Sequence, residues 1–275
     1  GSFKPRGAFN RLLSGAVPAA GVVAASGGNH GAAVAYAAQS LGVPAEIFVP
    51  APTPAVKRAR IEGFAARLVV GGASYEEARI ASETRAAETG AMLVHAYDQH
   101  EVLTGQGTIG LELEQDAPEL THVLIAAGGG GLFGGIGAWY AGRAGLVVVE
   151  PAACATLTMA QQAGAPVDVP VGGIAADSLG ARRAGRLAFE VLGATGATCV
   201  TLPDEAIIAG RRWLWEKLRI VAEPGGAAAL ALCYLAPGAP PLARGLVLCF
   251  VVRIATQEAW LRKRRRAGSC LLPAP

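Results

Sequence analysis

A single lysine near the start of the chain has neighbours that suit amine chemistry. Lys4 follows Phe3 and precedes Pro5, in the stretch Gly1-Ser2-Phe3-Lys4-Pro5-Arg6-Gly7-Ala8. The proline favours a tight loop that presents the amine and then enters a helix near Ala8. A lysine amine becomes a nucleophile when desolvation or a nearby cation lowers its pKa, and its usual product with a carbonyl is a Schiff base. Most loop lysines are solvated surface residues, so Lys4 predicts chemistry only together with other motifs.

A glycine turn follows the first apolar run. Residues 22–26 predict a short strand, and residues 32–41 an alanine-rich helix that Gly42 closes. The turn between them contains Ser26, Gly27, Gly28, Asn29 and His30. Backbone N–H groups at a helix start, with an amide and an imidazole beside them, suit an anion such as a carboxylate. The alternative is a simple helix cap in which His30 has no chemical role.

A second glycine turn lies near the middle of the chain. The nearly continuous apolar strand predicted over 121–127 is followed by Gly128, Gly129, Gly130, Gly131 and Leu132, and then by a helix to about Gly142. Without side chains to block approach, the backbone N–H groups and the helix N-terminus can hold a phosphate. The alternative is a flexible turn without a ligand.

The same glycines also satisfy a dinucleotide-binding pattern. Gly129, Gly131 and Gly134 have the required spacing, and Glu150 stands about 20 residues beyond, where an acid would bind the ribose. These residues alone would favour NAD. However, Pro151 follows the acid directly, the unit lies mid-chain, and an NAD site leaves Lys4 and the first glycine turn unexplained.

The elements that must position these motifs alternate between strand and helix. After the first turn we expect strands over 45–49, 67–70 and 92–95, and helices over 54–63 and 74–89. A loop over 97–107 then leads to a helix over 108–115. The second segment continues with strands over 146–150 and 245–252, and helices over 156–164, 187–192, 204–218 and 223–235. This pattern predicts an α/β fold with parallel sheets covered by helices. We expect a smaller domain over 18–100 and a larger one built from 1–17 and 101–275.

Composition narrows the class of protein. The chain has 275 residues, of which 52% are hydrophobic, enough for a sizeable core. Its net charge of +3 depends on the basic run 262–266, so the rest is slightly acidic and nucleic acid is not an expected partner. The five cysteines have no metal or disulfide spacing, which favours a reducing, cytoplasmic setting. No stretch reaches the ~20 apolar residues of a membrane span, so no membrane association is expected.

Five motifs, in this order, resemble those of pyridoxal-phosphate (PLP) enzymes with the tryptophan synthase β-like fold, called fold type II. They are Ser2-Phe3-Lys4-Pro5-Arg6-Gly7-Ala8, Ser26-Gly27-Gly28-Asn29-His30-Gly31, Gly105-Gln106-Gly107-Thr108, the run 128–132 and Glu223-Pro224-Gly225-Gly226-Ala227. The likeness covers residues 1 to about 249, and the chain looks like the serine/threonine dehydratase branch. It implies a two-domain PLP fold with parallel sheets.

The resemblance also implies roles for single residues. Lys4 would hold PLP as a Schiff base, Phe3 would pack on its pyridine ring, and Asn29 would bond its ring hydroxyl. Cys249 falls where the family places a neutral partner for the pyridine nitrogen, the alternative being an ordinary buried thiol. The cofactor phosphate would be bound by Gly128, Gly129, Gly130, Gly131 and Leu132. The substrate carboxylate would be bound by Ser26, Gly27, Gly28, Asn29 and His30.

The implied activity is that of an L-threonine/L-serine dehydratase (ammonia-lyase), which gives 2-oxobutanoate or pyruvate plus ammonia. Alternatives are another lyase of this fold, a serine racemase, or a truncated, non-catalytic domain that binds PLP or an amino acid. Gly27 makes racemisation less favoured, because racemase-like relatives carry a serine there as a second base. The resemblance further implies an amino acid as the small-molecule substrate, and a homo-oligomer, either a dimer or a tetramer.

Three departures from the family pattern remain. Asp177 matches a family aspartate near a cation site, but Ser178 replaces the following glycine, and we predict no metal. Residues 250–275 lack the expected Gly-x-Asn turn, so we expect an aberrant tail there. The Lys4 motif begins at the first residue, which predicts a truncated N-terminus with one sheet strand missing.

Overall fold

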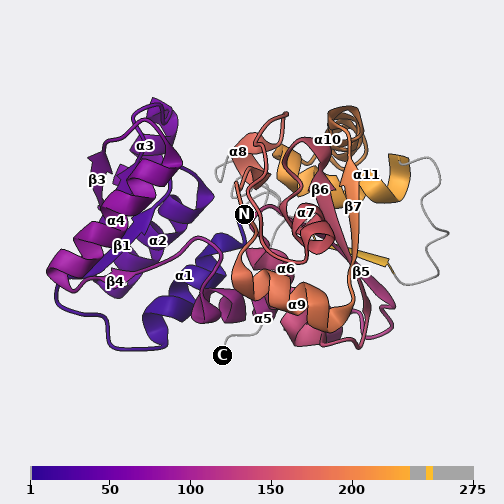
Figure 1. Ribbon diagram of the computed structural model, residues 1–275, viewed down its shortest axis with the longest axis horizontal. Helices are drawn as coiled ribbons and strands as arrows, with labels where there is room; N and C mark the ends of the chain where they lie inside the picture. Colours follow the sequence, from indigo (N-terminus) through magenta and orange to yellow (C-terminus); the bar gives the residue numbers. More distant parts are fainter. Residues whose placement is uncertain (1, 236–245, 250–275) are drawn as a thin grey trace, which may run out of the picture.

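The computed structural model describes residues 2–235 and 246–249, which contain two four-stranded parallel sheets. The first sheet has the order β3-β2-β1-β4, with β1 (Val22–Ala25), β2 (Ala45–Val49), β3 (Arg67–Val70) and β4 (Met92–Leu93). The second has the order β7-β6-β5-β8, with β5 (His122–Ala126), β6 (Gly145–Pro151), β7 (Thr198–Leu202) and β8 (Leu246–Cys249). Figure 1 shows the first sheet in the left half of the molecule and the second in the right half. The predicted α/β fold with parallel sheets is confirmed.

The first sheet is covered on both faces. Alternate residues of a strand point to opposite faces, so Val22 and Ala24 enter one apolar cluster, while Val23 and Ala25 enter another. The covering helices are α2 (Asn29–Leu41), α3 (Ala55–Glu62) and α4 (Tyr75–Thr89). The hydroxyl of Ser74 caps α4 by accepting from the backbone N–H of Glu77.

The second sheet is built in the same way. Val123 and Ile125 of β5 pack with α6 (Gly131–Tyr140), α7 (Thr156–Ala163) and α9 (Arg186–Thr195). Leu124 and Ala126 pack on the other face with α10 (Asp204–Leu218) and α11 (Pro224–Leu235). Strands buried on both faces explain the continuous apolar runs in the sequence.

Three helices cross closely beside the sheets: α1 (Lys4–Leu13), α5 (His100–Asp116) and α6. A Cβ on Gly105 would lie 2.4 Å from the carbonyl oxygen of Arg6, and one on Gly135 2.4 Å from that of Leu103. The predicted loop over 97–107 was therefore wrong from His100 onward. Glycines that suggested a loop instead allow helix backbones to touch.

Other local predictions also needed correction. Lys4 is the first residue of α1 and does not stand in a loop, because Pro5 fits the first turn of a helix, where its missing N–H costs nothing. The short helix α8 (Ala176–Leu179) lies in a stretch that looked like a polar loop. Strand β7 was missed because it is a half-exposed edge strand with threonines at positions 198 and 201.

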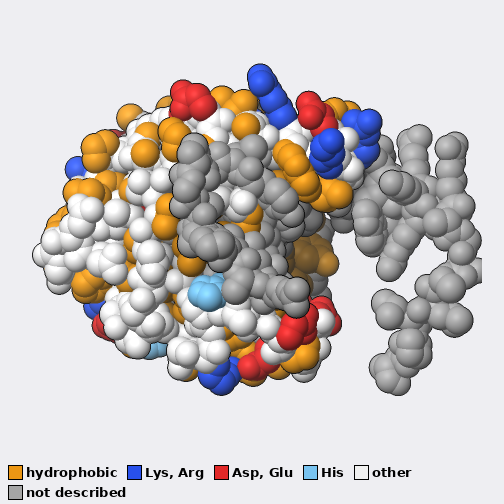
Figure 2. All heavy atoms as spheres, turned by 90° about the vertical axis from the view of Figure 1, so that its right-hand side faces the viewer, with side chains coloured by type: hydrophobic (Ala, Val, Ile, Leu, Met, Phe, Trp, Pro, Cys, Tyr) orange, Lys and Arg blue, Asp and Glu red, His pale blue; other side chains and the backbone are white. Residues whose placement is uncertain are grey.

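The surface carries mixed charge. Figure 2 shows Lys and Arg side chains and Asp and Glu side chains near the edges of the same face, with uncharged and hydrophobic side chains between them. Within the described part of the chain, no helix is long and apolar enough to cross a membrane. The tail predicted as aberrant, 250–275, lies outside the described residues.

Candidate active site

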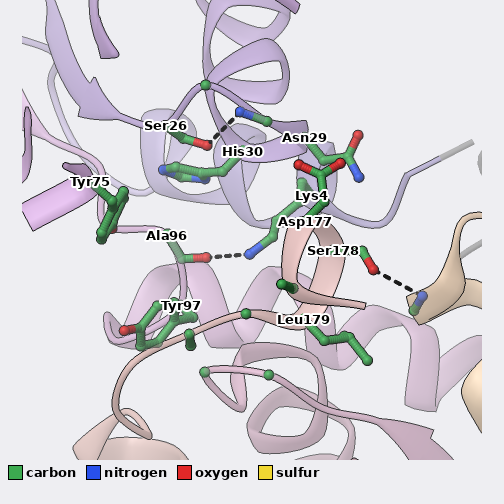
Figure 3. Close-up of a pocket in the computed structure, with 18 of the residues that line it drawn as sticks. Lys4, Ser26, Asn29, His30, Tyr75, Ala96, Tyr97, Asp177, Ser178 and Leu179 are labelled. Atoms are coloured by element: carbon green, nitrogen blue, oxygen red, sulfur yellow. Dashed lines mark hydrogen bonds between the residues drawn. The ribbon is translucent and has the colours of Figure 1, made fainter. Parts of the chain in front are cut away.

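One pocket of about 500 Å³ lies where both glycine turns face Lys4. Figure 3 shows Lys4 and Ala96 near its centre, with Ser26 and His30 on one side and Tyr97 on the other. The predicted site residues that line this pocket are Phe3, Lys4, Ser26, Gly27, Gly28, Asn29, His30, Gly128, Gly129, Gly130, Gly131 and Leu132. The structure thus brings together residues that are up to 129 positions apart, from Phe3 to Leu132.

Lys4 presents a desolvated amine. Its Nζ donates a hydrogen bond to the carbonyl oxygen of Ala96 at 2.6 Å and lies 5.0 Å from the centre of the Phe3 ring. Burial lowers the pKa of Lys4 to about 8, because the charged form loses its hydration. A substantial fraction of the amine is therefore neutral at pH 7 to 8, as a nucleophile or general base requires.

His30 is held neutral close to this amine. Its Nε2 lies 2.9 Å from the carbonyl oxygen of Val94, and since a carbonyl only accepts, this nitrogen carries the proton. Burial and then the charge of Lys4 lower the pKa of His30 to about 3. A neutral imidazole cannot act as a cation for a carboxylate, so the first turn must attract an anion through its N–H groups.

The first glycine turn is tied to the second half of the chain. The hydroxyl of Ser26 accepts from the backbone N–H of Gly28 at 3.1 Å. The side-chain Nδ2 of Asn29 donates to Glu223 at 2.9 Å. The N-terminal N–H groups of α2 have no acceptor within the helix and face the pocket wall formed by Ser26 to His30.

The second glycine turn is closely packed against protein. Gly130 has a φ of +87°, in the left-handed region, and α6 begins directly after it. A Cβ on Gly128 would lie 2.4 Å from the carbonyl oxygen of Leu179, and one on Gly129 2.7 Å from the Tyr97 ring. Glycine is thus required along this turn, which brings the N-terminus of α6 to the pocket.

Glu150 has a structural role that removes the basis for an NAD site. The side chain is fully buried, and it accepts from the backbone N–H groups of Leu157 and Thr158, both at 2.8 Å, at the start of α7. Burial raises the pKa of Glu150, and these hydrogen bonds oppose that shift. Its oxygens cap a helix and Glu150 does not line the pocket, so the acid of the dinucleotide pattern is not placed to bind a ribose there.

The structure describes the backbone of Cys249 but not its side chain. Its backbone ends β8 and pairs with Ile125, but its side chain lies outside the described residues, so its role toward a pyridine nitrogen stays a prediction. Asp177 forms an ion pair with Lys57 at the pocket edge. The prediction of no metal also stays a prediction.

Sequence reasoning missed several lining residues, namely Thr53, Lys57, Tyr75, Ala96, Tyr97 and Glu223. Thr53 follows the carboxyl end of a parallel strand, where ligands of α/β sheets commonly bind, and this rule could have found it. Tyr75 and Tyr97 carried no comparable signal. Glu223 begins the last of the five family motifs, but the sequence alone assigned it no role.

Comparison with known proteins decides the family. The model of the pyridoxal-phosphate dependent enzyme family matches residues 1–252. The chain belongs to this family. The L-threonine ammonia-lyase of Geobacter sulfurreducens is 35% identical over 236 residues, covering 84% of this chain and 59% of that protein. The biosynthetic L-threonine dehydratase of Escherichia coli is 35% identical over 235 residues, covering 84% and 46%. The chain therefore spans about half the length of these relatives.

Solved structures of the family share the fold. Threonine deaminase isoform 2 of Solanum lycopersicum, in its processed form, superposes with a TM-score of 0.84 at 26% identity, covering 98% of this chain and 80% of that chain. Maize serine racemase gives a TM-score of 0.83 at 28% identity, covering 97% and 84%. Lyases and racemases therefore share this architecture, and the fold alone does not choose between them.

The residues present fit the cofactor of the family, which is PLP. The pocket has the volume of a cofactor site. The amine of Lys4 has a lowered pKa, so it can react with the aldehyde carbonyl of the cofactor. The glycine turn 128–131 leaves the N-terminus of α6 accessible for a phosphate.

Proposed function

We propose that the protein is a PLP-dependent L-threonine/L-serine dehydratase (ammonia-lyase) that releases 2-oxobutanoate or pyruvate plus ammonia. The observation that carries this proposal is the desolvated amine of Lys4 in the pocket that both glycine turns line. The names of the relatives described above support the substrate class.

Each residue has a proposed task. Lys4 holds the cofactor and, once free, removes the Cα proton of the substrate through Nζ. Bound PLP supplies an electron sink for the negative charge that this step leaves. Phe3 would pack on the cofactor ring, Asn29 would bond its ring hydroxyl, and Cys249 would be the neutral partner of its pyridine nitrogen. The phosphate is assigned to residues 128–132 and the substrate carboxylate to residues 26–30.

The test is turnover of the purified protein with PLP. L-threonine and L-serine should give 2-oxo acid and ammonia in equal amounts, and Lys4→Ala should lower the rate by at least about 1,000-fold. The variant should also lose the visible absorbance of lysine-bound PLP. Lys217→Ala, which changes an exposed lysine of α10, is the matched control and should keep both signals. An active Lys4→Ala variant would remove the proposal.

Racemisation is the second candidate, favoured by the structural likeness to serine racemase. Formation of D-serine from L-serine, without pyruvate, would identify it. Binding of PLP without turnover of either isomer would instead favour a non-catalytic domain.

We further propose that the chain forms two domains. The smaller spans 18–100, and the larger combines 1–17 with 101–275. Each domain would have one of the two sheets at its centre. A homo-oligomer, as a dimer or tetramer, and a reducing, cytoplasmic setting complete the proposal. The free thiols of Cys154, Cys199 and Cys233 support the reducing setting.

A further inference from the structure

Thr53 is fixed in the loop between β2 and α3 and borders the pocket. Its side chain and backbone together are only 9% exposed. Its backbone N–H donates to the carbonyl oxygen of Pro50 at 3.0 Å, and its own carbonyl oxygen accepts from Nε of Arg58 at 2.8 Å. Both polar groups of its main chain are thus satisfied, which leaves the side-chain hydroxyl.

This hydroxyl points at the first glycine turn. Its Oγ1 lies 2.8 Å from the position that a Cβ on Gly27 would occupy. The structure shows no hydrogen bond from this hydroxyl to a described residue, and its oxygen is not fully enclosed by protein atoms. A hydroxyl that borders the pocket and has no partner in the protein can donate to a molecule bound there.

The N-terminus of α2, a helix of 13 residues, meets the hydroxyl at the same place. Its N–H groups and helix dipole favour an anion. The cations nearest this turn already have partners in the protein. Arg60 donates to Oδ1 of Asn29 at 3.4 Å, and Lys57 pairs with Asp177. Lys4 donates to the carbonyl oxygen of Ala96, and His30 is neutral. The absence of a side chain on Gly27 leaves the hydroxyl and the N–H groups open to one another.

We propose that the Thr53 hydroxyl donates a hydrogen bond to the carboxylate of the amino-acid substrate at the N-terminus of α2, and that Gly27 provides the space for this contact. The inference rests on the proposed function in one respect, that the ligand is an amino acid. It adds a residue from a different loop to the carboxylate site and makes residues 27 and 53 a coupled pair.

The binding experiment compares two ligands that differ at the carboxylate. L-Alanine has no β-leaving group, and L-alaninamide replaces its carboxylate by a neutral amide. Calorimetric titration of the PLP-loaded protein should show tighter binding of L-alanine. Thr53→Val keeps the shape of the side chain and removes its hydroxyl. This variant should lower the affinity for L-alanine by about tenfold or more and the affinity for L-alaninamide by less than about twofold. Thr53→Ser keeps a hydroxyl and should stay within about threefold of the unmodified protein.

Several results would overturn the inference. They are equal affinity of the unmodified protein for both ligands, an unchanged L-alanine affinity in Thr53→Val, or an equal loss for both ligands in that variant. If threonine and serine are turned over while the binding pattern fails, only this inference is wrong. If the binding pattern appears without any 2-oxo acid, only the dehydratase proposal is wrong.

A second measurement tests the coupled pair without substrate or cofactor. Gly27→Ala places a methyl group 2.7 Å from Cγ2 of Thr53, which must then move. Thermal unfolding should show a lowered midpoint for Gly27→Ala and a smaller added loss when Thr53→Ala is already present. Additive losses from the two changes would contradict the claim that Gly27 makes room for Thr53.

Discussion

The two glycine turns look alike in sequence, yet they use glycine for different reasons. Each connects a buried parallel strand, β1 or β5, to the N-terminus of a helix that borders the same pocket. At the second turn, all four absent side chains would lie within 2.7 Å of Leu179, Tyr97 or Ala188. At the first turn, a Cβ on Gly28 would meet only Ser26 Oγ, at 3.8 Å, whereas one on Gly27 would lie 2.7 Å from Cγ2 of Thr53.

The comparison distinguishes glycines that allow close protein packing from glycines that leave space for a ligand. Glycines of the second turn bring backbone against backbone and ring, so their replacement should disturb the fold itself. Gly28 of the first turn leaves open space beside N–H groups, so its replacement should mainly affect what binds, whereas a side chain on Gly27 would press against Thr53. Identical residue types in the same strand–turn–helix context therefore predict different responses to mutation.

The largest expected effect is at the second turn. Gly130→Ala combines a φ of +87° with a new methyl group 2.5 Å from Cβ of Ala188. We expect the free energy of unfolding to fall by about 3 kcal/mol in denaturant titrations. Gly193→Ala, in α9, is the control, because its added Cβ meets nothing within 4 Å. It should be neutral or stabilising by up to about 1 kcal/mol. Equal stability of both variants would refute a packing role for the second turn.

The next effect is a pH dependence of stability, which comes from His30 in the first turn. Burial and the charge of Lys4 lower the pKa of His30 to about 3, whereas the unfolded chain has an ordinary pKa near 6.5. Below pH 6.5 the unfolded state binds a proton that the folded state does not, so stability falls as pH decreases. We expect His30 to contribute a loss of roughly 2 kcal/mol between pH 6.5 and pH 5.

Unfolding by denaturant across this pH range measures the loss. His30→Gln should remove the contribution, while His122→Gln, away from the pocket, should retain it. A His30→Gln variant with the same pH slope as the unmodified protein would show that His30 is not held neutral by its surroundings.

The smallest effect belongs to Gly28. Gly28 is the N-cap of α2 with a φ of −113°, which other residues adopt. Gly28→Ala should lower the free energy of unfolding by less than about 1 kcal/mol, the usual difference between glycine and alanine at an N-cap. A loss as large as that of Gly130→Ala would erase the contrast between the turns.

Sequence patterns predicted much of this fold because its strands are buried on both faces. The run 22–26 and the helix over 204–218 appear almost unchanged as β1 and α10. Prediction failed where contacts distant in sequence override local preference. Gly105 by itself suggests a loop, yet it lies inside α5. It is a glycine at a place where the backbone of α1 leaves no space for a side chain. No local pattern carries that information.

The candidate site shows the same division. Ordered motifs identified Lys4 and both glycine turns, and the structure places them around one pocket. Thr53 and Tyr97 stand in loops whose sequences carry no recognised motif. Only the place of Thr53 after a parallel strand gave a signal, and the contacts of both residues became visible in the structure. The role proposed for the Thr53 hydroxyl depends on its position beside Gly27, which is 26 residues away in the chain.

The bond between Asn29 and Glu223 joins residues that are 194 positions apart. During synthesis at about 5–20 residues per second, Asn29 leaves the ribosome on the order of ten seconds or more before Glu223 exists. The first half of the chain can form its sheet and the N-terminus of α2 in that interval. The pocket, however, lacks one of its walls until the ribosome has made Glu223.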